Sequence, residues 1–307
     1  MSTLPDIAKD RPIPLGSIEP PTYEGYEIIR RIGIGAASVI FSVKHQKTGE
    51  IRALKHVVRC DDTDKRMIEQ VENEYRVGTR VDHPYVRNVY EIQRRKRRWL
   101  QTAEILLLME YCPGISLEQS ASRSLLDLML IFRMIAEGLN AMHQQGYLHC
   151  DIKPNNIIIA ENGAIRIIDL GQSCRLGTVK PRIQGTPDYI APEQVKRKPL
   201  VRATDVFNMG ATIYWALCGK HVPTLIPKQA DRVELVTESN TGPPPSPHQL
   251  KPQIPVGVSN LVMDCVEYSP KNRPPDMNTL ISRLDLLIHM IAGGRPIANV
   301  ANGNNDS

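Results

Sequence analysis

The chain has few features that would place it in a membrane, at a metal centre or in a disulfide-rich class. Its longest apolar helical stretch, residues 125–135, is interrupted by Asp127 and Arg133, so this stretch cannot span a bilayer. The N-terminus has no basic segment followed by an apolar one, so no secretory signal is expected. The six cysteines stand at least 24 residues apart, which gives neither a metal-ligand spacing nor a disulfide framework. We therefore expect a reduced, cytoplasmic location.

The excess of positive over negative charge is also small. The formal net charge is +5 on 307 residues, and two short basic runs, at residues 94–98 and 196–198, carry much of it. No aromatic stacking ladder and no known nucleic-acid module accompanies these runs. Short charge runs are usually solvated loops, so a nucleic-acid partner is not expected.

Two segments carry polar side chains in an arrangement suited to phosphoryl transfer. Residues 149–156 read HCDIKPNN, and residues 165–171 read IRIIDLG, an apolar strand that runs into a glycine turn. In-line transfer needs a carboxylate for the hydroxyl proton, a cation against the migrating phosphate and oxygen ligands for Mg²⁺. These groups are present as Asp151, as Lys153, and as Asn156 with Asp169.

At these residues the sequence resembles the eukaryotic-type protein kinases, in their Ser/Thr branch, and looks like the bacterial members of that type. The resemblance covers residues 26–291, with the motifs in order and in spacing. It implies an α+β, bilobal protein-kinase fold: a small antiparallel β lobe with one main helix, then a larger and mostly helical lobe. The expected parts are a mobile, proline-rich leader (1–25), an N-lobe (26–110), a C-lobe (111–291) and a disordered tail (292–307).

Alternating residues in the first part of the chain predict a β-hairpin that carries a lysine on an apolar face. Residues 39–43 and 51–57 alternate with period two around a turn, and Lys55 shares the parity of the apolar residues in its strand. Residues 65–80 follow with helical spacing and carry Glu74. The resemblance implies that Lys55 pairs with Glu74 and holds the α and β phosphates of ATP. Taken alone, the two residues are better explained as a surface lysine and a surface glutamate, and the other motifs in register favour the pair.

The resemblance also assigns residues around the nucleotide. The GIGAASV segment at residues 33–39 is similar to the kinase glycine-rich loop, with Ser38 where the third glycine usually stands. Residues 106–114 correspond to the hinge between the lobes, with Met109 as gatekeeper. The expected nucleotide-binding residues are Ile32, Gly33, Gly35, Val39, Ala53, Lys55, Glu74, Met109, Glu110, Cys112 and Ile158.

Within this set the resemblance implies that some residues contact the faces of the adenine ring and others contact its polar edge. The adenine ring would lie between Val39, Ala53 and Ile158, and the backbone of Glu110 and Cys112 would meet its polar edge. The cofactors implied are ATP and Mg²⁺, with Asn156 and Asp169 as metal ligands and Asp151 and Lys153 as catalytic residues.

The GTPDYIAPE segment at residues 185–193 resembles the peptide-docking segment of Ser/Thr kinases. The resemblance implies that Thr186 contacts the catalytic loop and that Glu193 pairs with Arg273. Asp205, near the start of a helix expected over residues 204–217, would brace the catalytic loop. A second long apolar helix is expected over residues 125–144.

Two positions depart from the family pattern. Cys150 stands where many kinases have the arginine that receives an activation-loop phosphate, so we expect activity that does not need phosphorylation at Ser173 or Thr178. Basic residues within that loop, at positions 175, 180 and 182, are the alternative partners for a phosphate. Gly78 stands where a bulky apolar residue is usual, which indicates an activating partner at the helix that carries Glu74.

The resemblance to the kinase family also predicts which residues flank the acceptor Ser or Thr. Kinases that favour an arginine upstream of the acceptor place carboxylates at positions that align here with Ser116, Asn155 and Trp215. None of these is acidic, and the basic run at residues 196–198 follows the docking segment. We therefore expect acceptor sites with neutral or acidic flanks.

These residues together favour one function and leave two alternatives. The favoured function is ATP- and Mg²⁺-dependent transfer of the γ-phosphoryl group to Ser/Thr hydroxyls of protein substrates. One alternative is a pseudokinase scaffold, which the intact set of Lys55, Glu74, Asp151, Asn156 and Asp169 argues against. The other is a small-molecule phosphotransferase, a class that generally lacks Lys153 in this context and the docking segment.

Overall fold

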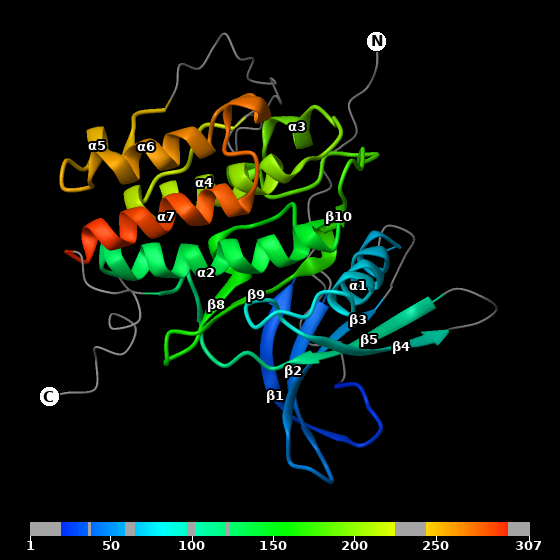
Figure 1. The fold of residues 1–307 in the computed structure, drawn as a ribbon. Helices are drawn as coiled ribbons and strands as arrows, with labels where there is room; N and C mark the ends of the chain where they lie inside the picture. Colours follow the sequence, from blue (N-terminus) through cyan, green and yellow to red (C-terminus); the bar gives the residue numbers. More distant parts are fainter. Residues whose placement is uncertain are drawn as a thin grey trace, which may run out of the picture. The chain divides into compact units, whose positions relative to one another are not determined.

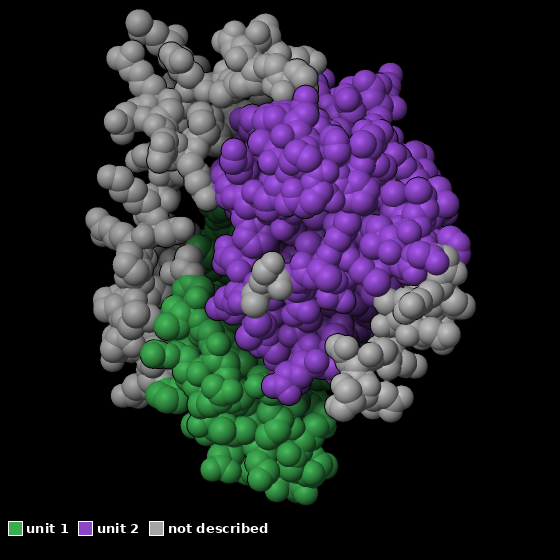
Figure 2. Space-filling view, turned by 90° about the vertical axis from the view of Figure 1, so that its left-hand side faces the viewer, with its two compact units in different colours: residues 1–79, 88–111 green, residues 80–87, 112–307 purple. Residues whose placement is uncertain are grey.

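The structure is a computed structural model that describes residues 20–35, 38–58, 65–96, 102–120, 123–224 and 244–293. By their contacts the residues form two compact units: residues 1–79 with 88–111, and residues 80–87 with 112–307 (Figures 1 and 2). Most of the expected leader and tail lies outside the described residues. Tyr23 is described, however, and its side chain is buried in the core of the first unit. Tyr23, which the sequence placed in the leader, is therefore part of the core of the first unit.

The first unit is built on a five-stranded antiparallel sheet in the order β1-β2-β3-β5-β4 (Figure 1). The strands are β1 Tyr26–Gly35, β2 Ser38–His45, β3 Ile51–Val58, β4 Val89–Lys96 and β5 Thr102–Glu110. Each face of the sheet carries an apolar cluster. One cluster includes Leu54 and Leu108, and the other includes Ala53 and Leu107. Both faces of β5 are covered, and residues 105–109 of this strand are accordingly a continuous apolar run rather than a strict alternation.

The helix α1, Lys65–Gly78, follows β3 and packs against β4 and β5 (Figure 1). Its buried side includes Val71, Glu74 and Val77, and the half-buried Tyr75 packs on the cluster that contains Ala53. The helix ends at Gly78, two residues before the end that the sequence predicted. Glycine is common at the ends of helices, so the ending fits the sequence.

The register of the β2–β3 hairpin decides which residues share a face. Ile40 lies opposite Lys55, whereas Val39 lies opposite His56. Residues directly opposite each other in an antiparallel pair have side chains on the same face. The face of Lys55 therefore carries Ile40 and Ala53 and is apolar, as predicted. Val39 is on the other face, so the prediction that Val39 and Ala53 flank one ring together is wrong.

The second unit is mostly helical. Its helices are α2 Leu125–Gln144, α3 Pro192–Val195, α4 Arg202–Cys218, α5 Pro247–Leu250, α6 Val256–Cys265 and α7 Met277–Ile291. Helices α2 and α7 lie side by side, and α4 packs against α6 and α2 (Figure 1). Most residues of α4 are buried, so this helix is the centre of the unit. The predicted helix at 125–144 is confirmed, and the one predicted at 204–217 starts two residues earlier.

Short strands position the polar segments of the second unit. They are β6 Ile115–Ser116, β7 Tyr147–Leu148, β8 Ile157–Ile159, β9 Ile165–Ile167 and β10 Cys174–Arg175. They pair as β6-β8-β9 and as β10-β7. Residues 149–156 therefore run between β7 and β8, each of which is fixed by a different partner strand. Among the described helices, none has both the length and the apolarity that crossing a bilayer requires.

Residues 80–87 follow α1 in the sequence but belong to the second unit. Ile167 donates a backbone hydrogen bond to Tyr85 O at 2.8 Å and accepts one from the N–H of Arg87 at 3.0 Å. Val86, between them, forms a parallel bridge with Ile167 and is fully buried. The sequence-based division, which gave residues 26–110 to one lobe, missed this excursion because it depends on pairing with a strand about 80 residues later.

Candidate active site

Lys55 and Glu74 form a buried ion pair within the first unit. Lys55 Nζ lies 2.7 Å from Glu74 Oε2, and the Glu74 side chain is fully buried while that of Lys55 is 15% exposed. Strand β3 places Lys55 on the apolar face, and α1 covers that face with Glu74. An isolated buried carboxylate is costly, so each charge fixes the other.

The apolar face next to Lys55 is formed by three strands. Ala53 on β3 lies directly opposite Met109 on β5, and both side chains are buried. Ile40 on β2 is half-buried on the same face, and Val39 is buried on the reverse face. The sequence-based residue set therefore missed Ile40. Counting the hairpin register outward from Lys55 would have found it, because opposite residues share a face.

The glycine-rich segment joins β1 to β2. Gly33 lies opposite Ile40 and Gly35 opposite Ser38, while residues 36–37 between them lie outside the described part of the chain. A Cβ atom on Gly35 would come within 2.7 Å of Ser38 Oγ, so the two strands approach closely here because residue 35 has no side chain. Ile32, the first expected nucleotide contact, is 36% exposed.

The end of β5 is tied to the start of β4. Glu110 donates its N–H to Asn88 O at 2.9 Å, and its carboxylate accepts the N–H of Asn88 at 3.1 Å. Tyr111 is the last residue of the first unit and Cys112 is the first of the next segment of the second unit. The predicted hinge therefore does coincide with the point where the chain passes between units.

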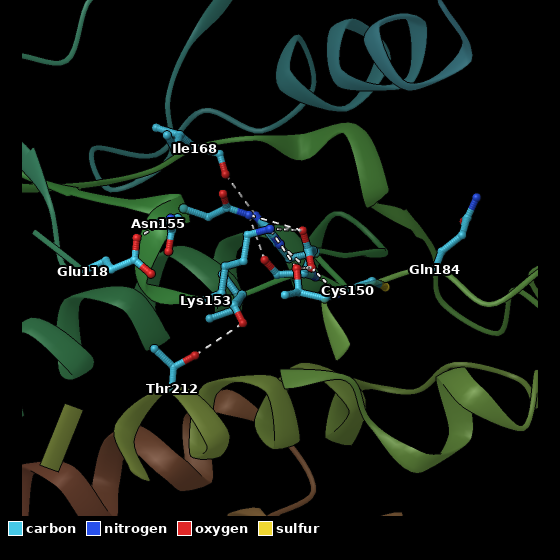
Figure 3. Close-up of polar contacts among 12 residues, drawn as sticks. Glu118, Cys150, Lys153, Asn155, Ile168, Gln184 and Thr212 are labelled. Carbon is cyan, nitrogen blue, oxygen red and sulfur yellow. Dashed lines mark hydrogen bonds and ion pairs between the residues drawn. The ribbon is translucent and has the colours of Figure 1, made fainter. Parts of the chain in front are cut away.

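Asp151 is held at both carboxylate oxygens by residues of the second unit. Its Oδ1 accepts hydrogen bonds from the N–H and the Oγ1 of Thr186, at 2.9 and 2.8 Å. Its Oδ2 lies 3.2 Å from Lys153 Nζ, which also donates to Thr186 Oγ1 at 2.7 Å. Figure 3 shows Lys153 among these contacts, between Asn155 and Cys150. The carboxylate has a fixed orientation and can accept the proton of a hydroxyl group.

Asn156 and Asp169 are brought together by the β8–β9 hairpin. Ile168 donates its N–H to Asn156 O at 2.9 Å, and Asp169 is the next residue in the chain after Ile168. The Nδ2 of Asn156 donates to Asp151 O at 2.9 Å, so the carboxamide oxygen is turned away from that bond. In β8 the middle residue, Ile158, is half-buried, whereas Ile157 and Ile159 are buried.

These oxygen donors fit Mg²⁺. Carboxylate and carboxamide oxygens are hard ligands, and Mg²⁺ usually takes one or two of them and keeps water and phosphate as the rest. Within the described residues no cluster of three His, Cys, Asp or Glu side chains could hold a metal ion. The donor set of Asn156 and Asp169 is therefore suited to a metal that arrives with phosphates, and not to an all-protein metal cage.

His149 links the catalytic segment to the residue before Asp169. Its Nδ1 accepts the N–H of Asp151 at 3.2 Å, so the neutral ring carries its proton on Nε2. Nε2 then donates to Ile168 O at 3.3 Å (Figure 3). The ring is fully buried, and its two bonds couple the positions of Asp151 and Asp169.

Asp205, on α4, stabilises the start of the catalytic segment, residues 149–156, as predicted. Its carboxylate accepts the backbone N–H of His149 at 2.8 Å and that of Cys150 at 2.7 Å, and lies 2.8 Å from His143 Nε2. Burial alone would raise the pKa of Asp205, but the hydrogen bond from His143 and those from the backbone lower it below its ordinary value. The brace therefore carries a negative charge at neutral pH.

Backbone strain concentrates at the same place. Three non-glycine residues in the described part of the chain have positive φ, and two of them are Cys150 at 65° and Asp169 at 63°. A non-glycine residue in this region costs about 1–3 kcal/mol and persists only where the surroundings impose it. Cys150 directly precedes the candidate base, and Asp169 is the candidate metal ligand, so the strain lies at the reacting groups.

The docking segment is anchored to the helical core. Arg273 binds both oxygens of Glu193, at 2.8 and 3.0 Å, and both side chains are buried. Gln194 donates its Nε2 to Cys150 O at 2.8 Å. The predicted pair of Glu193 and Arg273 is therefore present, and the segment that carries Thr186 is fixed relative to the catalytic loop.

The family follows from a comparison with known proteins. The model of the protein kinase domain matches residues 26–283. The chain belongs to the protein kinase domain family. Similar curated proteins include a "Probable serine/threonine-protein kinase" of Clostridium acetobutylicum, at 23% identity over 84% of this chain and 39% of that protein. The maternal embryonic leucine zipper kinase of Danio rerio is 29% identical over 81% of this chain and 36% of its own length. The Aurora kinase of Eremothecium gossypii is 28% identical over 67% of this chain and 56% of its own length.

The chain thus spans only 36 to 56% of the length of these three relatives. What it shares with them is the kinase domain itself. The two-unit, sheet-then-helices arrangement that the sequence predicted is the fold of this family and is confirmed.

Two features of this kinase domain were not predicted from its sequence. The exposed Glu118 accepts a hydrogen bond from Asn155 Nδ2, which puts a carboxylate beside the catalytic loop (Figure 3). The thiols of Cys150 and Cys174, 24 residues apart, lie 3.5 Å from each other. Neither contact has a signal in local spacing, because each joins separate segments of the chain.

Proposed function

We propose that this chain is a protein Ser/Thr kinase that transfers the γ-phosphoryl group of ATP to hydroxyl groups of protein substrates. The observation that carries the proposal is the Asp151 carboxylate, fixed by Thr186 at one oxygen and by Lys153 at the other. A carboxylate beside an ammonium is the pair that phosphoryl transfer to a hydroxyl needs, one group for the proton and one for the phosphate charge.

The proposed roles follow from the groups that surround each residue. Asp151 accepts the proton of the acceptor hydroxyl, and Lys153 faces the transferred phosphate. Lys55, held by Glu74, contacts the α and β phosphates. Asn156 and Asp169 hold Mg²⁺, which when bound neutralises phosphate charge.

The proposed nucleotide contacts combine the expected set with the sheet register. Ile32, Gly33 and Gly35 lie in the glycine-rich segment, and Ala53 and Met109 provide the apolar surface of the first unit for the adenine ring. Ile158, in the second unit, stays a predicted contact of the ring. We assign Ile40 to that surface in place of Val39, because Ile40 shares the face of Ala53. The backbone of Glu110 and Cys112 meets the polar edge of the ring.

A protein acceptor is supported by the docking segment. Residues 185–193 are anchored through Glu193 and Arg273, at 2.8 Å. A small-molecule acceptor would not need such a segment. The names of the similar proteins, serine/threonine-protein kinase and Aurora kinase among them, point to the same acceptor class.

We further propose a reducing, cytoplasmic setting, which fits the free thiols of Cys112, Cys150, Cys174, Cys218 and Cys265. An activating partner at α1 stays a prediction. The ion pair of Lys55 with Glu74 is present in the single chain, so such a partner would act on the stability of this pair and not create it.

An assay with labelled ATP and Mg²⁺ tests the function. The acceptors are a generic protein with exposed Ser and Thr, and a panel of amino sugars and choline. We expect label on Ser and Thr of the protein and none on the small molecules, and labelling at least about a hundredfold slower with the Asp151→Asn variant. Transfer to the panel alone would indicate a small-molecule enzyme, and ATP binding without any transfer would indicate a pseudokinase.

A further inference from the structure

Cys150 and Cys174 form a thiol pair in the second unit, at the base of the catalytic loop. Their Sγ atoms lie 3.5 Å apart. Cys150 is fully buried and Cys174 is partly exposed. The pairing of β10 with β7 places Cys174 opposite Leu148, two residues before Cys150. Leu148, Cys150 and Leu200 form one buried cluster, and Cys174 packs against it. The fold, not the sequence spacing, brings the two thiols together.

The two thiols have different surroundings and therefore different reactivities. The hydrogen bond from Cys150 lowers the pKa of Cys174, and the Lys180 cation nearby lowers it further against the effect of burial. The hydrogen bond given to Cys174, together with complete burial, raises the pKa of Cys150. Lys180 itself is buried and donates to Gln172 O. Cys174 is therefore the thiol that is more readily present as thiolate, the nucleophilic form, and it is also the one that solvent can reach.

We propose that Cys150 and Cys174 are a modification site, at which a peroxide converts the two thiols reversibly into an intramolecular disulfide. The Cys174 thiolate attacks hydrogen peroxide, the O–O bond breaks, and the products are Cys174 sulfenic acid and hydroxide. The Cys150 sulfur then attacks the sulfenic sulfur, an S–S bond forms, and the oxygen leaves as water. In total two thiols and one peroxide give one disulfide and two waters, and a dithiol reductant reverses the change.

The geometry requires only a short movement. A disulfide has a sulfur to sulfur length of about 2.05 Å, so the thiols must close by somewhat less than 1.5 Å from 3.5 Å. Cys150 is not free to move alone, because its N–H is bound to Asp205 and its carbonyl oxygen to Gln194. The activation segment at Cys174 and the catalytic loop at Cys150 therefore shift together when the bond forms.

Closure has a consequence for activity, and this part of the inference rests on the proposed kinase function. Cys150 directly precedes Asp151, and Gln194 follows the segment that carries Thr186. A displacement of about 1 Å at a reacting group is enough to lower a rate about a hundredfold. Disulfide formation is therefore expected to reduce transfer, and reduction is expected to restore it.

The test uses the full chain, treated with graded hydrogen peroxide, then alkylated without reductant, digested and analysed by mass spectrometry. We expect a linked peptide pair that joins Cys150 to Cys174 and disappears with dithiothreitol. We expect Cys174→Ser to abolish this link and Cys218→Ser to leave it unchanged. Absence of the Cys150–Cys174 link in the oxidised wild-type protein would overturn the proposal.

Two further measurements separate the parts of the inference. Iodoacetamide should label Cys174 before Cys265, because complete burial raises the pKa of the Cys265 thiol to about 12. Turnover of the wild-type protein should fall more than tenfold as the link forms and recover on reduction, while Cys174→Ser keeps its activity in peroxide. Linked protein with unchanged turnover would overturn the regulatory part. A reduced protein that transfers no phosphate would contradict the proposed function alone, because the peptide mapping does not depend on activity.

Discussion

Asp151 shows at the scale of single residues how the site separates proton chemistry from metal binding. Its carboxylate oxygens accept hydrogen bonds from Thr186 and contact Lys153. Asn156 Nδ2 donates to the backbone oxygen of Asp151 at 2.9 Å and makes a longer contact, 3.4 Å, with Oδ2. Asp169 directly follows Ile168, whose backbone oxygen lies 3.3 Å from His149 Nε2. We expect the two carboxylates to have different roles, Asp151 toward the acceptor hydroxyl and Asp169 toward Mg²⁺.

Replacing each carboxylate by its amide should separate the two roles. We expect Asp151→Asn to lower kcat by about a hundredfold or more, because general base catalysis contributes about that factor, and to leave ATP affinity within about twofold. Asp169→Asn should instead weaken Mg²⁺·ATP binding. Calorimetric titration of both variants with Mg²⁺·ATP checks this, and an equal loss of affinity in the two would contradict the division of roles.

Thr186 is expected to act by positioning Asp151. Its hydroxyl group accepts from Lys153 and donates to Asp151, at 2.7 and 2.8 Å. Thr186→Ala should lower kcat about tenfold, equal to roughly 1.4 kcal/mol of barrier, with little change in the KM for ATP. Thr186→Ser keeps the hydroxyl and should recover most of the rate. A Ser variant as slow as the Ala variant would show that the methyl group, and not the hydroxyl, matters.

At the scale of elements, the activation segment is held by its own contacts. Gly177 donates its N–H to Leu200 O at 2.8 Å, and Leu200 donates to Thr178 O at 3.0 Å. Lys180, one of the basic residues considered as a phosphate partner, is buried and bound to Gln172 O. The segment therefore needs no phosphate to define its path.

We accordingly expect activity without phosphorylation of this segment. Ser173 is 4% exposed and so is poorly accessible as an acceptor, and Thr178 has no arginine at position 150 to receive its phosphate. Phosphatase treatment and the Ser173→Ala/Thr178→Ala variant should change kcat by less than about threefold. A decrease of more than about tenfold, roughly 1.4 kcal/mol, would show that a phosphate is required.

The contact between α4 and α6 is close because Gly210 has no side chain. A Cβ atom there would lie 2.5 Å from Cys265 Cβ, inside any permitted contact. Gly210→Ala should lower the free energy of unfolding by about 1–3 kcal/mol, as overpacking does. Gly257→Ala is the matched control, because its Cβ would meet only the flexible end of Leu287 at 3.0 Å. Chemical denaturation compares the two, and an equal effect would show that close packing is not the cause.

At the scale of the whole molecule, the structure alters the expected substrate preference. The acidic flanks predicted from the sequence depended on the absence of carboxylates and on the basic run at 196–198. Glu118 now stands beside Asn155. Lys196 lies over the Tyr268 ring at 4.6 Å, and Arg197 donates to Pro181 O at 3.0 Å. Two of the three basic side chains are thus engaged within the chain, and one exposed carboxylate lies beside the catalytic loop.

We therefore expect a weak preference for a basic residue upstream of the acceptor Ser or Thr. Exposed ion pairs contribute about 0.2–1 kcal/mol, which corresponds to at most about fivefold, and salt reduces it. A positional peptide library at low and moderate ionic strength measures the preference. Glu118→Gln should remove it without changing turnover of a neutral peptide. A preference for acidic flanks in both proteins would restore the expectation from the sequence.

The sequence alone determined the family of this protein and much of its local structure. Residue types at short spacing predicted Asp151, Lys153, Asn156 and Asp169 as the catalytic and metal-binding residues, because these four residues lie close together in the sequence. The helix at 125–144 was also predictable, since its apolar period and its cap at Ser124 are local. The pair of Lys55 and Glu74 was implied by the family resemblance and is present at 2.7 Å, whereas parity and helical spacing alone did not predict it.

Tertiary structure decided which distant residues meet. The hairpin register put Ile40 and not Val39 beside Ala53, and pairing with Ile167 drew residues 80–87 into the second unit. The thiols of Cys150 and Cys174 meet only because β10 pairs with β7. In each case the contact joins segments that are separate in the chain, and its existence depends on how strands align. Local pattern carries no record of that alignment, because the same alternation fits more than one register.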